Sequence, residues 1–200
     1  MRFEELEISE PILRALKEEQ YETPTPIQAE AIPHILERKD VMGSAQTGTG
    51  KTAAFTLPML QKIAAQAGGG RRHIKALVLA PTRELAAQVE DSVRTYGRHL
   101  KLRSLSVCGG AGIGPQIRQM NSGVDILVAT PGRLMDHIEE QGYTQTQAAE
   151  AFGIDQPRVS LLMNGRISKF TIDYLINMCE EAGVNWDINR EEAYAGSSES

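Results

Sequence analysis

The segment AQTGTGKT (45–52) constrains the fold of this chain more than any other part of its 200 residues. It follows a short apolar run, DVMGSA (40–45), and leads into KTAAFTLPMLQKIAAQ (51–66), which has the composition of a helix. A glycine-rich turn between a strand and a helix is typical of a phosphate-binding loop. The segment therefore predicts an α/β unit with a strand over 40–45 and a helix that begins near residue 51.

The chemistry of this segment also fits an anion. Gly48 and Gly50 allow backbone N–H groups to turn inward and approach phosphate oxygens closely, and the N-terminus of the following helix favours negative charge. Lys51 can reach the β- and γ-phosphates of a nucleotide, and the hydroxyl of Thr52 can bind Mg²⁺. Ala45 stands where the strict pattern has glycine, but the flanking elements still favour a phosphate loop over a chance glycine turn.

Three further apolar runs follow the loop: ALVLA (76–80), LRSLSVC (102–108) and DILVAT (125–130). They alternate with helical patterns such as RELAAQVEDSVRTYGRHL (83–100). Short continuous apolar strands between amphipathic helices are typical of a parallel sheet. The expected fold class of this part of the chain is therefore α/β with a parallel sheet.

Upstream of the loop, YETPTPIQ (21–28) combines an aromatic ring with an amide. An aromatic ring can stack on adenine, and an amide can donate to and accept from its N6/N7 edge. Taken alone, Tyr21 and Gln28 fit a packed turn better than a base pocket. Beside a phosphate loop they become candidates for adenine recognition.

Five motifs, YETPTPIQ, AQTGTGKT, PTRELA (81–86), GG (109–110) and TPGR (130–133), stand in the order found in DEAD-box RNA helicases. The chain resembles this family, and within it the bacterial RhlE-type branch, over roughly residues 3–138. The resemblance implies a RecA-like domain that binds ATP, Mg²⁺ and RNA. The residues it assigns to ATP are Tyr21, Gln28, Ala45, Gln46, Thr47, Gly48, Thr49, Gly50, Lys51 and Thr52, with Thr52 also on the metal. The residues it assigns to the RNA backbone are Pro81, Thr82, Arg83, Gly110, Thr130, Gly132 and Arg133, and the two arginines can neutralise phosphates.

The catalytic motifs of that family do not occur in these 200 residues. Phosphoryl transfer needs a carboxylate for Mg²⁺, a group that orients the attacking water and usually an arginine finger. The resemblance implies that a D-E-A-D motif would supply the Mg²⁺ carboxylate and the water-orienting group. These 200 residues contain no D-E-A-D motif, no S-A-T motif and no second RecA-like domain. The nearest imitation is YLINMCEEAG (174–183), whose apolar residues repeat at helical intervals. We therefore expect weak hydrolysis and unwinding at most.

The missing motifs also have a structural consequence. Their strands would lie in the middle of the sheet, beside the strand that precedes the phosphate loop. Without them, we expect that strand to have an open edge and an uncovered apolar face. Residues 1–133 are then expected to be only marginally stable alone.

The segment YTQTQAAEAFGIDQPRVSLLMNG (143–165) has a different pattern. Thr144 and Gln147 form the signature of a capping box, and Gly153 is placed to end the helix that follows. Asp155 caps a second short helix that has Pro157 in its first turn. Apolar residues on the inner faces of the two helices are Ala148, Ala149, Phe152, Val159, Leu162 and Met163. Two short helices joined by a tight glycine turn indicate a helix-turn-helix.

This segment resembles the XRE family of Cro-like repressors, and within it the small antitoxin-like regulators. The resemblance implies DNA binding through Gln145, Gln156, Arg158, Leu161 and Asn164. Glutamine suits adenine and arginine suits guanine as a bidentate partner. VNWDI (184–188) is predicted to be a short strand whose edge serves a homodimer. A helical bundle that does not bind DNA is the alternative, because residues 143–175 hold three basic and three acidic side chains.

The charge balance changes along the chain. Residues 1–133 hold 17 Lys and Arg against 14 Asp and Glu, whereas residues 134–200 hold 4 against 12. Such a shift is a candidate domain boundary. The predicted organisation is a truncated RecA-like domain over 1–133, an all-α helix-turn-helix domain over 134–190 that shares the helix 134–141 with the junction, and a flexible tail over 191–200.

No secretory signal or membrane-spanning run occurs in the sequence, so a cytoplasmic location without membrane contact is expected. Three functions remain open. The chain is a helicase relative that binds ATP and RNA, a DNA-binding regulator with a vestigial helicase part, or a chimera without a joint function.

Overall fold

The computed structural model describes residues 1–46, 48–66 and 73–163. At its centre lies a parallel sheet in the order β1-β3-β2, formed by β1 (Ala76–Leu79), β2 (Ser104–Val107) and β3 (Ile126–Ala129). Ala76 and Ser104 both pair with Ile126, so the three strands are in register over their whole length. The expected α/β class with a parallel sheet is confirmed.

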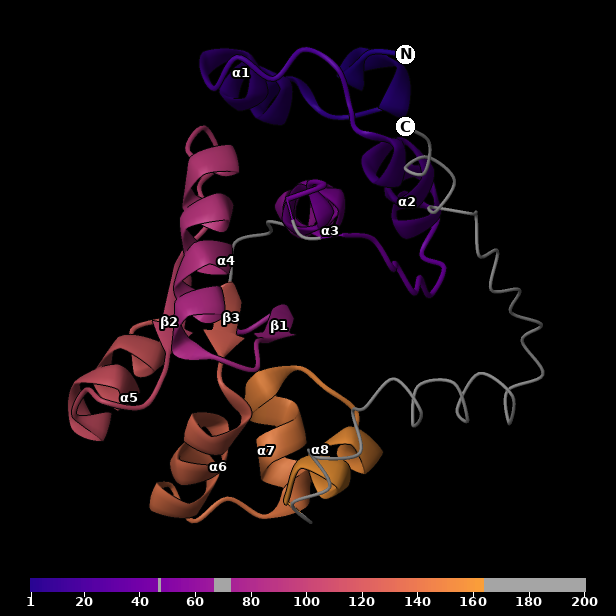
Figure 1. The fold of residues 1–200 in the computed structure, drawn as a ribbon. Coiled ribbons are helices and arrows are strands. Elements are labelled where there is room, and N and C mark those ends of the chain that lie inside the picture. The colour runs from indigo at the N-terminus through magenta and orange to yellow at the C-terminus, as the bar shows by residue number, and fades with distance from the viewer. Residues whose placement is uncertain (47, 67–72, 164–200) are drawn as a thin grey trace, which may run out of the picture.

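Nine helical segments surround the sheet in the described residues (Figure 1). They are the 3₁₀ turn η1 (Phe3–Leu6), α1 (Glu10–Glu18), α2 (Pro26–Leu36), α3 (Lys51–Ala65), α4 (Arg83–Tyr96), α5 (Ile113–Asn121), α6 (Pro131–Glu140), α7 (Gln145–Phe152) and α8 (Gln156–Met163). Local sequence explains many of their ends. Pro131 opens α6 at its first position, where a missing N–H costs nothing. The Thr82 Oγ1 accepts from the N–H of Leu85 at 3.2 Å at the start of α4.

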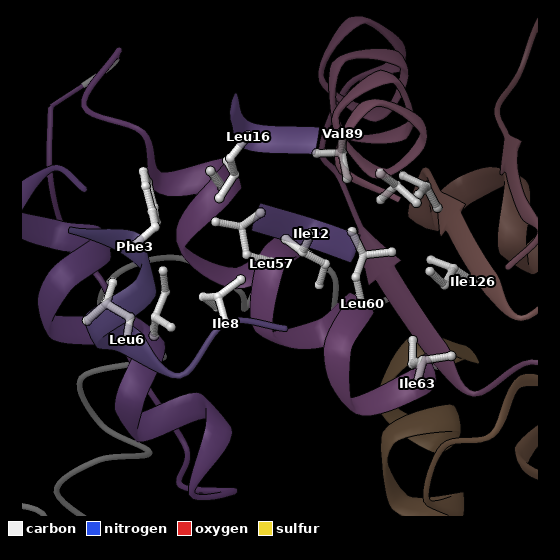
Figure 2. Packing of buried hydrophobic residues seen from close by; sticks show 14 of the residues in the cluster. Phe3, Leu6, Ile8, Ile12, Leu16, Leu57, Leu60, Ile63, Val89 and Ile126 are labelled. Carbon is white, nitrogen blue, oxygen red and sulfur yellow. The ribbon is translucent and has the colours of Figure 1, made fainter. Parts of the chain in front are cut away.

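The central strand β3 separates two apolar cores, since its side chains alternate between the faces of the sheet. Ile126 and Val128 belong to the first core, and Leu127 and Ala129 to the second; all four are fully buried. The first core joins β3 to η1, α1, α2, α3 and α4, and Figure 2 shows Ile12, Leu57 and Leu60 within it. The second core joins β3 to α6, α7 and α8, which lie on the opposite side of the sheet in Figure 1.

The predicted strand over 40–45 is absent, which corrects the sequence interpretation. The side chains of Val41 and Met42 are 40% and 55% exposed instead of buried in a sheet. A strand needs a neighbour for its backbone N–H and C=O groups, and no further strand of the described residues lies beyond β1. The open edge expected on the strand before the phosphate loop therefore belongs to β1.

A groove with a volume of about 650 Å³ lies along this open edge. Its lining is mostly apolar and includes Phe55 and Met59 of α3 and Leu77 and Leu79 of β1. The expected uncovered apolar face is thus present, but it is formed by α3 and β1.

The helix-turn-helix expected from the sequence is confirmed in outline by α7 and α8. The Thr144–Gln147 capping box is formed, and Gly153 ends α7 with a φ of 64°. Ala148, Phe152, Val159 and Leu162 are buried, as the pattern predicts. These residues share the second core with β2 and β3, so the helical module packs directly on the sheet.

The division into domains at residue 133 stays a prediction. Several expectations fall outside the described residues: the helix over 174–183, the strand over 184–188 and the tail over 191–200.

Candidate nucleotide and nucleic-acid sites

Three of the predicted motifs meet at the carboxyl edge of the sheet. PTR follows β1, GG follows β2 and TPGR follows β3. In parallel sheets the carboxyl ends of the strands share one edge, where ligands usually bind. Backbone hydrogen bonds continue the pairing past the strands: the N–H of Ala80 donates to the Ala129 O at 2.9 Å, and that of Thr130 to the Val107 O at 3.2 Å.

Arg83, at the start of α4, contacts the glycine pair after β2. Its Nη1 donates to the carbonyl O of Gly109 at 3.1 Å, and the residue is exposed. Gly110 has a φ of 93°, and a Cβ at this position would overlap Arg83 Nη1. Glycine is therefore needed at 110 both for its backbone conformation and for the close approach of the guanidinium.

Arg133, in the first turn of α6, approaches the same loop from the other side. Its Nη2 donates to the carbonyl O of Ala111, its Nε to Gln116 Oε1 at 3.1 Å and its Nη1 to Asp136 Oδ2 at 3.2 Å. The side chain is only 12% exposed. Residues 109–111 are thus held between two guanidinium groups.

Two residues that the sequence reasoning missed complete this arrangement. Gln116 of α5 is buried; its Nε2 donates to the Cys108 O at 3.1 Å, and its Oε1 lies 3.1 Å from His137 Nε2. His137 of α6 is fully buried, and this burial and the charge of Arg133 lower its pKa, against an opposing effect of Asp136. The sequence contains a signal for His137, because it lies three residues after Leu134 on the apolar face of a helix.

The remaining predicted RNA residues lie at the same edge with fewer contacts. Pro81 and Thr82 are exposed, and Thr82 caps α4. Thr130 is the half-buried N-cap residue of α6. Gly132 is exposed and has open space around its Cα.

The phosphate loop leads into α3 as expected. Gly48 and Gly50 have φ values of 85° and 89°, and Gly50 is the N-cap residue of α3. Lys51 Nζ donates to the carbonyl O of Gln46 at 2.9 Å and to that of Ala45, so its ammonium lies over the loop. The other predicted residues are Thr49, whose Oγ1 donates to the Gln46 O at 2.8 Å, Thr52 in the first turn of α3, and Thr47, which lies outside the described residues.

Gln28 ties the start of α2 to this loop. Its Oε1 accepts from the N–H of Thr25 at 3.0 Å, and its Nε2 donates to the carbonyl O of Gly50 at 3.1 Å. A Cβ at Gly50 would overlap the Gln28 amide. Both polar atoms of the predicted adenine reader are therefore engaged within the protein.

Tyr21 lies in different surroundings. It is 52% exposed and packs edge-to-face on Tyr96, with ring centroids 6.4 Å apart. It borders a cavity of about 720 Å³ whose lining includes Phe3 and Leu13 but not Gln28. Burial, and to a lesser extent Tyr21, raises the pKa of Tyr96 to about 12.

A magnesium ion at this loop would take the hydroxyl of Thr52 and phosphate oxygens of a nucleotide as ligands. The described residues contain no group of three or more His, Cys, Asp and Glu side chains placed to hold a metal by themselves.

Four of the candidate DNA-binding residues lie on α7 and α8. Gln156 Nε2 donates to Gln145 Oε1 at 2.5 Å, which links the first residues of the two helices. Arg158 is exposed, with its Nε 3.9 Å from Asp155 Oδ2. Leu161 is half-buried, and Asn164 lies outside the described residues. Gln145 and Gln156 thus lie side by side, and Gln156 and Arg158 are exposed on α8.

The parallel sheet, the phosphate loop before α3 and the arginine-bearing carboxyl edge define a RecA-like domain of the helicase type. The family model for DEAD/DEAH box helicases matches residues 25–155, which is more than half of the chain. The chain belongs to the DEAD/DEAH box helicase family. A model for a helix-turn-helix domain matches residues 126–190 and so overlaps the first over β3, α6 and α7.

Individual relatives agree with the helicase assignment. The chain is 45% identical over 139 residues to the DEAD-box ATP-dependent RNA helicase CshA of Bacillus cereus, covering 70% of this chain and 26% of that protein. It is 46% identical over 138 residues to the ATP-dependent RNA helicase DeaD of Klebsiella pneumoniae, covering 68% and 21%. The chain thus spans about a quarter of the length of these curated relatives.

A solved structure gives the same fold. The RNA helicase Prp28 from Chaetomium thermophilum bound to ADP matches with a TM-score of 0.64 and 40% identity, over 70% of this chain and 35% of that one. The RhlE-type branch and the XRE and antitoxin-like assignments stay predictions. In the part of the chain that the structure describes, no helix combines the length and the apolar character needed to cross a membrane.

Proposed function

We propose that this chain binds ATP with Mg²⁺ and an RNA backbone, and that it hydrolyses ATP weakly or not at all. RNA binding is supported mainly by the loop 109–111 at the carboxyl edge of the sheet. The exposed Arg83 contacts this loop, and α4 and α6 begin at the same edge. Phosphate oxygens are recognised by arginine and by N–H groups at such helix starts. Contacts of this kind hold a nucleic-acid backbone without reading its sequence.

The phosphate loop supports the nucleotide part. The positive φ of Gly48 and Gly50 gives the loop the conformation that turns N–H groups toward an anion. Lys51 is bonded to loop carbonyls and is therefore already close to where phosphates would bind. Gln28 connects the segment that includes the predicted adenine readers to that loop. The similar solved structure of the RNA helicase Prp28 is bound to ADP, which also supports a nucleotide site in this chain.

Weak hydrolysis is proposed because these 200 residues hold no D-E-A-D and no S-A-T. A phosphate loop alone can bind a nucleotide but lacks the carboxylate that holds Mg²⁺ and the group that orients water. The segment 40–45, which would flank the catalytic strand, forms no strand in this chain.

Binding and turnover can be measured separately. We expect a fluorescent ATP analogue to bind the full chain and Lys51→Ala to reduce its affinity at least tenfold. Phosphate release with poly(U) RNA is expected to stay at background. Rapid RNA-stimulated phosphate release would refute the proposal of weak hydrolysis, and the absence of analogue binding would refute the nucleotide site.

A second candidate function is DNA binding through α7 and α8. The Gln145–Gln156 hydrogen bond favours it, because it fixes the amide of Gln156 at the exposed start of α8. A fixed amide can make a bidentate contact with adenine at a smaller entropic cost. A homodimer, which would double the phosphate contacts, belongs to this proposal and rests on no contact in the structure.

Footprinting on palindromic DNA tests this candidate. Gln156→Ala and Arg158→Ala are expected to weaken protection, whereas Glu150→Ala, on the exposed surface of α7, serves as the control. Equal protection by all three variants would exclude groove recognition by α8. Sedimentation of the same samples would show whether a dimer forms.

A further inference from the structure

The two arginines at the carboxyl edge of the sheet have different surroundings. Arg83 is exposed, and one hydrogen bond, to the carbonyl O of Gly109, is found for it in the described chain. Arg133 is 12% exposed, and each of its three guanidinium nitrogens donates to a protein oxygen. A guanidinium that is enclosed and satisfied is a poor partner for a phosphate from solvent.

Gln116 determines where the Arg133 guanidinium lies. Its Oε1 is 3.1 Å from both Arg133 Nε and His137 Nε2, and its Nε2 donates to the carbonyl O of Cys108. The amide orientation is unambiguous, because Arg133 offers only donors and the Cys108 carbonyl only an acceptor. It follows that His137 Nε2 carries a proton and donates to Gln116.

Moving Arg133 toward a ligand would break this arrangement. The buried Oε1 of Gln116 would lose one of its two donors, and the carbonyl O of Ala111 would lose Arg133 Nη2. Keeping Arg133 inward is therefore favoured, and this holds the end of the loop 109–111 against α5 and α6.

We propose that Arg133 is a clamp on the loop 109–111, that Gln116 and His137 position this clamp, and that Arg83 is the arginine left to bind a phosphate. The last part rests on the proposed RNA binding. The clamp itself does not, because it concerns contacts within the free protein. Gln116 and His137 are positioning residues, since they act on RNA through Arg133 and the loop.

The first experiment measures the loop without RNA. Backbone ¹⁵N order parameters are recorded for Gly109, Gly110 and Ala111 in the full chain. We expect rigid values of about 0.85 in the wild type and values below about 0.6 in Gln116→Leu and Arg133→Lys. Gln119→Leu, on the exposed side of α5, is the matched control and should leave the loop rigid.

Gln116→Glu separates positioning from a general loss of packing. A carboxylate can still accept from Arg133 and His137, so this variant is expected to keep the loop rigid although it loses the donor to Cys108. Unchanged amide shifts in β3 show that each variant is folded. A rigid loop in both Gln116→Leu and Arg133→Lys would overturn the clamp, and so would a loop that is mobile in the wild type.

The second experiment uses poly(U) RNA at several salt concentrations. For single strands, each phosphate contact contributes about 0.7 to the slope of log affinity against log salt. Arg83→Gln is expected to lower the slope by about that amount, whereas Arg133→Gln and Gln116→Leu should weaken binding at an unchanged slope. A slope lowered by Arg133→Gln would overturn its assignment as a clamp. If the wild type does not bind RNA, the proposed function fails while the order parameters still decide the clamp.

Discussion

A Cβ placed on Gly153 would lie 2.5 Å from the backbone carbonyl O of Ile74. Gly153 ends α7 inside the helix-turn-helix, and Ile74 lies two residues before β1 of the RecA-like sheet. The turn between the two short helices is therefore docked against the helicase part of the chain, next to a core that both parts share.

This contact predicts that Gly153→Ala strongly destabilises the protein. Alanine at a φ of 64° is strained by about 1–2 kcal/mol, and the carbonyl of Ile74 is backbone that cannot rotate away. Gly142→Ala is the matched control, because Gly142 has a φ of 61° but open space around it. We expect a clearly larger loss of unfolding free energy in urea for Gly153→Ala. Equal losses would mean that the contact with Ile74 has no energetic weight.

The glycine pair after β2 gives a second prediction. Gly110→Ala forces Arg83 Nη1 away and strains a backbone with a φ of 93°, so RNA affinity should fall about tenfold, equivalent to about 1.4 kcal/mol. Gly109→Ala meets no atom within 4 Å and should bind RNA as the wild type does. Filter binding of poly(U) RNA measures both. Similar affinities of the two variants would contradict the role given to Gly110.

A third prediction concerns Gln28, which links α2 to the phosphate loop. Gln28→Ala leaves the N–H of Thr25 and the carbonyl O of Gly50 without these partners. The expected loss is about 1–3 kcal/mol of stability, together with a smaller rise of Tm on adding an ATP analogue. Gln88→Ala, at an exposed position of α4, is the control. An unchanged nucleotide-induced rise in Tm would show that the link does not shape the loop.

A fourth prediction concerns pH. The pKa of His137 is lowered in the folded protein, mainly by burial, so the unfolded chain takes up a proton at a higher pH than the folded one. Stability from this group is present above the ordinary histidine pKa of about 6.5 and is lost as the pH falls below it. His137→Gln should therefore flatten the decline in unfolding free energy between about pH 7.5 and pH 5.5.

His73→Gln provides the comparison for this measurement, since His73 is exposed. The unfolding free energy of His73→Gln is expected to decline over the same pH range as much as that of the wild type. If His137→Gln declines as steeply as the wild type in urea unfolding, His137 is not the group whose protonation lowers stability.

Most of the local secondary structure of the described residues could be predicted from the sequence. The three strands, the helix after Gly50 and the capped helix that begins after Thr144 were predicted because each depends on a few neighbouring residues. The parallel sheet also followed, since apolar runs separated by helices have few other arrangements. The motifs PTR, GG and TPGR follow these strands, and parallel strands bring their carboxyl ends to one edge.

Only the tertiary structure decided which polar groups of these residues form hydrogen bonds within the protein and which do not. The segment 40–45 has the composition of a strand, yet it forms none without a neighbouring strand. Gln28 and Arg133 were predicted to contact ligands, which stays a prediction, and in the free protein both donate to oxygens of the protein itself. Hydrogen bonds between residues such as Arg133, Gln116 and His137, which lie on two helices, leave no periodic trace in a sequence. The sequence determined which chemical groups are present, and long-range packing determined which of them are engaged within the protein.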